Sequence, residues 1–332
     1  MPEKSTDDQP GERIAKVIAR AGLASRRQAE AWIAAGRVAV NGAVIASPAL
    51  NVTKRDKIAV DGLPLPRRAR TRLFRYHKPR GLMTTHSDPQ GRDTIFHALP
   101  KKLPRLISVG RLDLNSEGLL LLTNDGGLAR ALELPSTGWE RRYRVRALGR
   151  VTQEALDGLQ RGVSVAGVRY GPIEATLDRE QGANVWLTMG LREGKNREVR
   201  KILEHLGLKV NRLIRVSYGP FELGDLDDGA VEEVETAELR KALGPELAAQ
   251  AQADFEGPLE GEARTIPPRH PEVRARDARE PRRMTGPGRA SFEARLRRAP
   301  QDDGERPVRP DRKKKHRRDR TGGPRPSRPR PK

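Results

Sequence analysis

Four consecutive leucines, Leu119–Leu122, constrain the fold of this 332-residue chain more than any other stretch. Turn-forming Gly, Asp, Asn and Ser residues stand on both sides of the run, and a shorter apolar piece, Leu106-Ile107, precedes it. A short apolar run between turn signals is typical of a buried strand. We therefore expect Leu119–Leu122 to lie inside a sheet, with the preceding turn at the mouth of that sheet.

Asp113 stands in this turn. A carboxylate held at the mouth of a sheet can act as a nucleophile or as a base. The same spacing suits an Asx turn that caps a strand, because Asp is a common turn former. Spacing alone leaves both interpretations of Asp113 open.

The charge balance indicates a polyanionic partner. Lys plus Arg is 65 against 44 Asp plus Glu, which gives a net charge of +21 and a pI near 10.9. RNA, DNA and an anionic membrane surface all fit such a charge. No apolar stretch approaches the roughly 18 residues that a membrane span needs. The first ten residues, 1–10, are polar and acidic, unlike a signal peptide, and we expect a disordered lead there.

Cysteine is absent, which excludes disulfides and thiolate metal sites and favours a cytoplasmic location. The six histidines show no spacing typical of metal ligands. We therefore expect no bound metal.

Residues 11–66 predict a small domain of two helices followed by short strands. The apolar positions between Ile14 and Leu23 share one face of a helix that ends near Gly22. Ser25-Arg-Arg-Gln has the form of a capping box at the start of a second helix. Asn41-Gly is a strong signal for a two-residue hairpin.

Residues 67–72 form a basic linker, and residues 73–245 predict an α+β domain in which strands and helices follow one another in mixed order. Thr152 and Asn196 each suit the N-cap of a helix, and these helices are expected to end near residues 160 and 206. The strand candidates are Phe74–Tyr76, Tyr143–Leu148, Ile173–Leu177, Val185–Met189 and Leu213–Tyr218.

The remaining residues, 246–332, predict a disordered tail. Residues 251–332 hold 13 of the 26 prolines, with 24 basic and 13 acidic residues and few large apolar ones. Such a stretch cannot offset an ordering entropy of about 1–2 kcal/mol per residue. The tail is suited to tether RNA through counterion release, and the alternative is a solubilising tail.

Three motifs resemble those of the small-ribosomal-subunit type of pseudouridine synthase. They are His77-Lys-Pro-Arg-Gly-Leu-Met-Thr-Thr, then Gly110-Arg-Leu-Asp-x-x-Ser-Glu-Gly-Leu-Leu-Leu-Leu-Thr-Asn-Asp-Gly, then Glu193-Gly-Lys-Asn-Arg-Glu-Val-Arg-Lys-Ile-Leu with Leu213-Ile-Arg-Val. The resemblance implies a mainly antiparallel sheet crossed by the active cleft. It also implies an isomerase that breaks the bond from ribose to uracil N1 and rejoins the base through C5, with no cofactor.

The same resemblance implies three catalytic residues. Asp113 is the essential one, and Arg200 approaches its carboxylate and keeps it ionised. Tyr143 lies against the target base, where stacking contributes about 1–3 kcal/mol. Period-two alternation places Tyr143 and Val145 on one strand face and the neighbouring arginines on the other. Without the resemblance, Arg200 would be a charge on a helix surface and Tyr143 a core residue.

The N-terminal segment resembles the S4 RNA-binding domain through Ala-Ser-Arg-Arg-x-Ala-Glu and Gly-Arg-Val-x-Val-Asn-Gly. Guanidinium groups beside its second helix could grip phosphates, and the alternative is a solvated helix start with incidental charge. The candidates for RNA contacts are Arg26, Arg27 and Arg37 in this domain, and Lys78, Arg111, Lys195 and Arg197 in the three motifs.

We expect a monomer whose partner is ribosomal RNA or a ribosome assembly precursor, without membrane contact. The long basic tail and Gly-Lys-Asn-Arg-Glu-Val-Arg resemble members of this family that act on the large subunit, and this resemblance implies one uridine in the peptidyl-transferase region of 23S rRNA as the target. A uridine of 16S rRNA, or another 23S site, is the alternative target. Two rival classes are a non-catalytic RNA-binding assembly protein and a glycosylase that releases the free base through a carboxylate near C1′.

Overall fold

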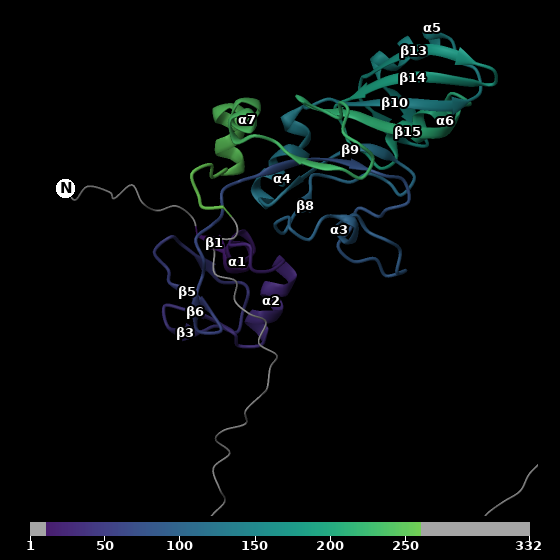
Figure 1. Cartoon of the computed structure of the whole chain (residues 1–332). Helices are drawn as coiled ribbons and strands as arrows, with labels where there is room; N and C mark the ends of the chain where they lie inside the picture. Colours follow the sequence, from purple (N-terminus) through teal and green to yellow (C-terminus); the bar gives the residue numbers. More distant parts are fainter. Residues whose placement is uncertain (1–10, 260–332) are drawn as a thin grey trace, which may run out of the picture. The chain divides into compact units, whose positions relative to one another are not determined.

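The computed structural model describes residues 11–259 (Figure 1). The expected lead, residues 1–10, and the tail from residue 260 onward lie outside the described residues. The N-terminal domain is built from β1 (Glu12–Arg13), α1 (Ile14–Arg20), α2 (Arg26–Ala34), β2 (Val38–Val40), β3 (Ala43–Val44), β4 (Asn51–Val52), β5 (Ile58–Val60) and β6 (Leu63–Pro64).

Local signals explain the N-terminal domain. The Ser25 hydroxyl accepts from the Gln28 N–H and the Gln28 amide oxygen accepts from the Ser25 N–H, so the predicted capping box is confirmed. Asn41 and Gly42 both have positive φ, as a two-residue hairpin turn between β2 and β3 requires. The four antiparallel strands β3-β2-β5-β6 share one core with the two helices, which includes Ile18 and Ile33.

The second domain is organised around a nine-stranded sheet in the order β13-β14-β10-β15-β9-β7-β17, with β16 beside β15 and β8 beside β9. Every pairing is antiparallel except that of β9 with β15, which confirms the expected α+β class. The strands are β7 (Leu73–Lys78), β8 (Ile107–Ser108), β9 (Glu117–Thr123), β10 (Arg141–Leu148), β13 (Ile173–Gln181), β14 (Asn184–Leu191), β15 (Lys209–Tyr218), β16 (Phe221–Glu222) and β17 (Val231–Glu233); a separate hairpin is formed by β11 (Val163–Val165) and β12 (Val168–Tyr170).

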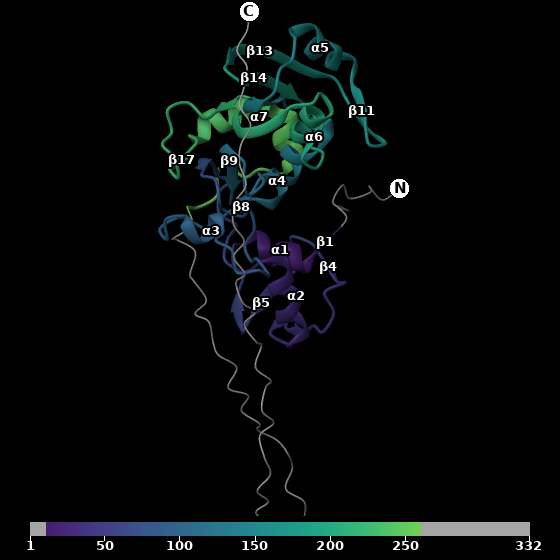
Figure 2. The ribbon, with the colours of Figure 1, turned by 90° about the vertical axis from the view of Figure 1, so that its right-hand side faces the viewer.

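The leucine run forms the centre of this sheet, as predicted. Every residue of β9 is buried, and alternate leucines enter two different core clusters. Leu119 and Leu121 pack under α4 (Gly126–Glu133) and α7 (Thr236–Ala251), which lie beside each other in Figures 1 and 2. Leu120 and Leu122 pack on the opposite face with the segment that holds α3 (Ile95–Ala98).

The other half of the sheet has its own core under α5 (Gln153–Asp157), which lies beside β13, and α6 (Glu198–His205) (Figure 2). Short 3-10 turns follow α4 (Pro135–Thr137) and α5 (Gly158–Arg161). The Thr152 hydroxyl accepts from the Ala155 N–H, so that predicted N-cap is confirmed.

The predicted start of α6 at Asn196 is wrong. The helix is preceded by Arg197, which has left-handed backbone angles and no side-chain cap. Instead the Glu198 carboxylate accepts from the Lys195 N–H at 2.9 Å. The loop before the helix is therefore closed by a side chain of the first helical turn, and not by an N-cap side chain. This αL residue turns the chain sharply just ahead of the helix.

The predicted tail boundary at residue 245 is also wrong for the residues that the structure describes. Gly244 has non-helical angles (φ 62°, ψ 177°) and separates α7 into two helical pieces. Pro245 opens the second piece, because proline is tolerated in a first helical turn. Ala251 is 1 % exposed and Phe255 packs on the core under β9, so residues 246–259 belong to the folded domain.

The expected basic linker, residues 67–72, is bonded to the start of α4 and to the segment after α7. Arg68 pairs with Asp125 at 2.5 Å, and the Thr71 hydroxyl donates to the same carboxylate at 2.7 Å. The Thr71 N–H donates to the Asp254 carbonyl. Residues 67–72 are therefore anchored to α4 and to the segment after α7.

Candidate active site

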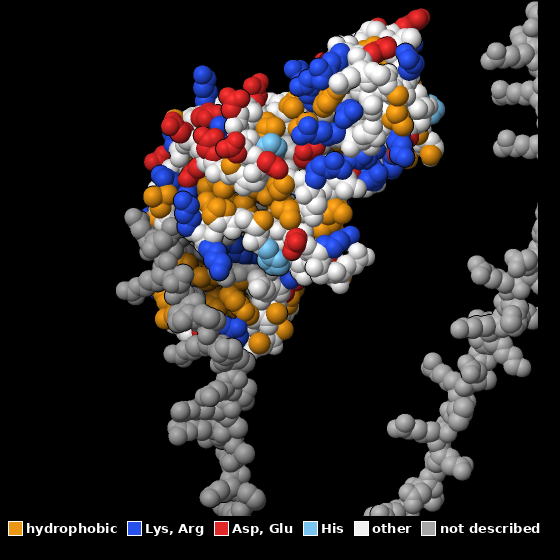
Figure 3. Space-filling view, turned by 45° about the vertical axis from the view of Figure 1, so that its right-hand side comes forward, with side chains coloured by type: hydrophobic (Ala, Val, Ile, Leu, Met, Phe, Trp, Pro, Cys, Tyr) orange, Lys and Arg blue, Asp and Glu red, His pale blue; other side chains and the backbone are white. Residues whose placement is uncertain are grey.

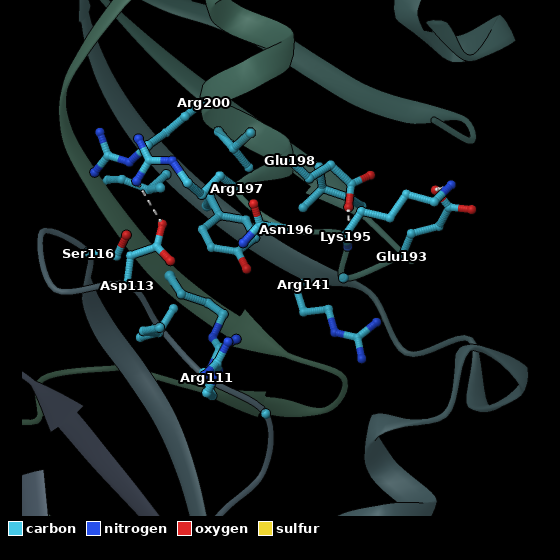
Figure 4. A pocket seen from close by; sticks show the side chains of 18 of the residues that line it. Arg111, Asp113, Ser116, Arg141, Glu193, Lys195, Asn196, Arg197, Glu198 and Arg200 are labelled. Carbon is cyan, nitrogen blue, oxygen red and sulfur yellow. Dashed lines mark hydrogen bonds and ion pairs between the residues drawn. The ribbon is translucent and has the colours of Figure 1, made fainter. Parts of the chain in front are cut away.

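A cavity of about 540 Å³ opens where the large sheet divides. Strand β15 pairs with β9 only at Glu117 and Gly118, and β8 takes its place beside β9 from Leu121 onward. Arg215 spans the gap, because its Nε donates to the Leu119 carbonyl at 2.7 Å. The lining includes Arg111, Asp113, Ser116, Arg141, Tyr143, Lys195, Arg197, Glu198, Arg200 and Arg215, several of which are labelled in Figure 4.

Gly118 makes the close contact at this division possible. Its φ is +102°, and a Cβ there would lie 2.3 Å from the Arg215 carbonyl oxygen. Only glycine combines this backbone conformation with so close an approach of the two strands. The parallel joint between β9 and β15 therefore depends on Gly118, the glycine of Ser-Glu-Gly in the second of the three motifs.

The loop that carries Asp113 is held by the first motif. Lys78 Nζ donates to the Ser116 carbonyl at 3.0 Å, and the Gly81 N–H donates to the Leu114 carbonyl at 2.8 Å. The Thr84 hydroxyl donates to the Leu112 carbonyl at 2.8 Å. Three contacts thus fix the backbone on both sides of Asp113 while its side chain stays 37 % exposed toward the cavity.

Arg197 is the cation nearest to Asp113 among the recorded ion pairs of residues 11–259. Its Nη1 lies 3.4 Å from Asp113 Oδ2, and Figure 4 shows the contact as a dashed line. The Arg197 side chain is 46 % exposed. The sequence predicted Arg200 beside this carboxylate; Arg200 lines the same cavity, and the ion pair with Asp113 adds Arg197 to that prediction.

Arg200 lies deeper and contacts backbone. Its Nη2 donates to the Asn115 carbonyl at 3.1 Å and its Nη1 to the Val210 carbonyl at 3.3 Å. Burial is the main cause that lowers its pKa from the usual arginine value, and the neighbouring Arg197 charge lowers it further, whereas Asp113 raises it. Arg200 therefore ties α6 to the loop of Asp113 and adds positive charge behind it.

Tyr143 lies in the same cavity on β10. It is half-buried and packs against two core clusters, while Arg142 and Arg144 on either side are exposed, as alternation predicted. Arg141 departs from that prediction. It is buried on the cavity side, where it donates to the Arg192 carbonyl and to the Tyr218 hydroxyl at 2.6 and 2.7 Å.

The predicted RNA contacts fall into three groups. Arg111, Lys195 and Arg197 are exposed and line the cavity, and Arg26 and Arg27 are exposed at the start of α2. Arg37 is engaged by Asp61 through two hydrogen bonds of 2.9 and 2.5 Å and lies over the Trp32 ring. Lys78 is 0 % exposed, so its assignment as an RNA contact is wrong; burial lowers the pKa of its ammonium group to about 8.

The cavity residues that the sequence analysis did not single out include Arg141, Arg215 and Glu198. Arg141 could have been found, because it shares the strand parity of Tyr143. Arg215 and Glu198 stand in the third motif, but the motif alone does not show that their side chains line the cavity. Their positions depend on the parallel joint with β9 and on the left-handed turn at Arg197.

Comparison with known proteins agrees with this geometry. Residues 72–205 match the profile of the RNA pseudouridylate synthase family, and residues 12–58 match the S4 domain. An uncharacterized RNA pseudouridine synthase of Rickettsia felis is 47 % identical over 230 residues, which cover 69 % of this chain and 100 % of that protein. The chain belongs to the RNA pseudouridine synthase family.

Other relatives of this synthase carry a more specific name. Proteins described as ribosomal large subunit pseudouridine synthase B are 44 % identical in Pseudomonas aeruginosa, over 69 % of this chain and 61 % of that one, and 38 % identical in Haemophilus influenzae, over 80 % and 78 %. A crystal structure of a pseudouridylate synthase has a TM-score of 0.50 at 24 % identity and covers 70 % of this chain and 99 % of that one. That structural match supports the fold.

The synthase is thus an isomerase with an N-terminal S4 domain, of the small-ribosomal-subunit type that its motifs indicated. Within residues 11–259, no three His, Asp or Glu side chains gather in a way that could hold a metal ion. No helix of that same range is long and apolar enough to cross a bilayer.

Proposed function

We propose that this synthase isomerises one uridine in the peptidyl-transferase region of 23S rRNA, as a cytoplasmic monomer. The names of the relatives from Pseudomonas aeruginosa and Haemophilus influenzae support a large-subunit target. A uridine of 16S rRNA is the alternative, since the motifs are shared across the family type. Arg26 and Arg27 of the S4 domain would contact phosphates, which position RNA without reading its sequence.

One observation carries the assignment of Asp113. Its carboxylate is exposed into the cavity beside Tyr143, while the backbone on both sides is held by Lys78, Gly81 and Thr84. A reacting group needs this combination of access and fixed position. An Asx turn that only capped a strand would need neither the cavity nor the three anchors.

The reaction requires the target base to leave its stack, which costs a few kcal/mol, so that C1′ and C6 become accessible. Asp113 acts on the sugar or on the base, and the N1–C1′ bond breaks. The uracil turns, C5 bonds to C1′, C5 loses its proton and N1 gains one, so that the product is an isomer of uridine. Tyr143 holds the turning base by stacking, and it is placed to assist the loss of that proton.

The two arginines have different parts in this proposal. Arg197 balances the charge of Asp113 directly, and its exposed side chain is free to contact the RNA backbone at the same time. Arg200 is a positioning residue, because it holds the loop through the Asn115 carbonyl. Arg111 and Lys195 line the cavity entrance with further positive charge for phosphates.

Mapping of pseudouridines in the ribosomal RNA of a strain that lacks this gene tests the target. One pseudouridine of 23S rRNA should disappear and return when the wild-type gene, but not the Asp113→Asn gene, is restored. Loss from 16S rRNA instead would select the alternative target. Unchanged pseudouridines in both RNAs would contradict the proposal, and abasic sites in place of pseudouridine would indicate a glycosylase.

A further inference from the structure

The sheet half made of β13, β14, β10 and β15 has one face that lies opposite the active site. Tyr143 and Val145 of β10 point to the face covered by α5 and α6, and the cavity is on that side. Arg142, Arg144 and Arg146 point the other way, because successive side chains of a strand alternate. Figure 3 shows Lys and Arg side chains gathered over this lobe of the molecule.

The registers place the arginines of this open face around one tryptophan. Trp186 of β14 is the cross-strand partner of Arg146 on β10 and of Arg179 on β13. The Arg144 and Arg179 guanidinium carbons lie 5.0 and 5.6 Å from the Trp186 ring centroid. An aromatic ring holds a guanidinium group at this distance through cation–π attraction, which restricts its motion and leaves its N–H groups free to donate.

In the described part of the chain, the neighbouring arginines have carboxylate partners, whereas the arginines around Trp186 do not. Arg142 pairs with Glu140 at 2.9 Å, and Arg150 pairs with Glu180 at 3.4 Å. None of the recorded ion pairs of residues 11–259 involves Arg144, Arg146 or Arg179. The nearby Asp178 accepts from the Thr188 hydroxyl at 3.0 Å.

Two donor groups of this cluster are buried inside it. Arg146 Nε and the Trp186 indole N–H are both buried and have no hydrogen-bond partner among the described residues. Guanidinium groups that are held on a ring and form no ion pair within residues 11–259 suit a polyanion.

We propose that Arg144, Arg146 and Arg179, arranged around Trp186, form a second RNA-binding surface that contacts phosphates of the substrate away from the target uridine. The proposal rests on the proposed function, because RNA is the polyanion that this enzyme modifies. The surface and the cavity lie on opposite faces of one sheet. A short stem-loop that fills the cavity therefore does not reach the surface, whereas a large folded RNA extends around the sheet edge to it.

The test compares Arg144→Ala/Arg179→Ala with the wild-type synthase on two RNAs, full-length 23S rRNA transcribed in vitro and a short stem-loop that carries the target uridine. Affinity for 23S rRNA should fall about tenfold or more, and the slope of log affinity against log salt should fall by about 1.5, at roughly 0.7–0.9 per lost phosphate contact. The single-turnover rate on saturating stem-loop should stay within about twofold of wild type.

Two matched variants serve as controls. Arg142→Ala removes an arginine of the same strand and face that already has a carboxylate partner, and it should leave both affinity and salt slope near wild type. Arg144→Lys/Arg179→Lys keeps the charge and should retain most of the salt slope. An unchanged melting temperature in each variant shows that the sheet is intact.

Equal losses in the Arg142→Ala and double-alanine variants would overturn the proposal, as would an unchanged salt slope in the double variant. A reduced single-turnover rate on the stem-loop would also overturn it, because the surface would then act through the active site. If wild-type protein formed no pseudouridine in 23S rRNA, the proposed target would fail, and the binding measurements would still decide whether the surface holds RNA.

Discussion

The two arginines near Asp113 differ in burial, and this difference determines what each can contribute. Arg197 and Asp113 are both substantially exposed, at 46 % and 37 %, and their pair is 3.4 Å apart. Exposed pairs of this kind contribute about 0.2–1 kcal/mol. Arg200 is 8 % exposed and fixes the loop backbone through Asn115, so its removal moves the catalytic residue itself.

We expect Arg200→Met to lower kcat on the order of 100-fold, because a displacement of about 1 Å at a reacting group costs that much. Arg200→Lys should recover only a little, since lysine cannot reproduce the two-branched contact to the Asn115 and Val210 carbonyls. Arg197→Met should lose less than about tenfold. Single-turnover rates of the three variants at saturating RNA test these expectations. Normal turnover by Arg200→Met would show that Arg200 is an ordinary charge on a helix.

Lys78 predicts a pH dependence of stability. Its folded pKa of about 8 lies below the value of about 10.4 for an unfolded lysine. Below pH 8 both states are protonated, and the folded state carries the full cost of a buried ammonium group. Between about pH 8 and 10.4 the unfolded state binds more protons than the folded state, so the wild type should gain stability relative to Lys78→Met. Denaturant unfolding of both proteins across this pH range measures the gain in the free energy of unfolding. A difference in that free energy that did not change with pH would contradict the lowered pKa of Lys78.

At the scale of elements, the joint between β9 and β15 connects the two halves of the sheet. Gly118→Ala places a methyl group 2.3 Å from the Arg215 carbonyl oxygen at a φ of +102°. We expect several kcal/mol of destabilisation, because both the clash and the backbone conformation oppose alanine. Gly182→Ala is the control, since its φ of +58° gives strain of about 1 kcal/mol with no atom within 4 Å. Similar losses in the two variants would show that the joint tolerates a side chain.

The elements also show what the sequence could and could not reveal. The capping box at Ser25, the Asn41 hairpin and the buried strand at Leu119–Leu122 depend on local pattern, and all three were predicted. The parallel joint at Gly118 and the burial of Lys78 depend on contacts between residues far apart in the chain, which no local pattern reports. The predicted boundary at residue 245 was wrong because Gly244 and Pro245 permit a kink followed by a new helical turn.

The candidate site was predicted in its residue types more than in its contacts. Asp113, Tyr143 and Arg200 do share one cavity. The ion pair with Asp113 is formed by Arg197, whose backbone is left-handed. The sequence placed Arg197 in the first turn of a helix and gave no sign of that conformation. Arg141 was predicted on the wrong strand face, although residues two apart on a strand share a face and Arg141 therefore lies on that of Tyr143.

At the scale of the whole molecule, the corrected boundary separates folding from RNA capture. Truncation after Leu259 should preserve the melting temperature and the single-turnover rate, whereas truncation after Leu247 removes Ala251 and Phe255 from the core and should lower the melting temperature. Residues 260–332 carry 24 basic and 11 acidic residues, so their loss should weaken RNA binding and flatten its salt dependence. An unchanged salt slope after truncation at Leu259 would indicate that the tail serves solubility only. A lower melting temperature of that variant would show that the folded domain extends beyond residue 259.

The central claim is that one carboxylate, held at the division of the sheet, carries out the isomerisation. The most direct test compares wild-type and Asp113→Asn proteins for pseudouridine formation in 23S rRNA and for affinity to the same RNA. We expect the wild type to form one pseudouridine and Asp113→Asn to form none, with affinity within about twofold of wild type, because phosphate contacts elsewhere carry most of the binding. Substantial pseudouridine formation by the Asp113→Asn protein would contradict the claim.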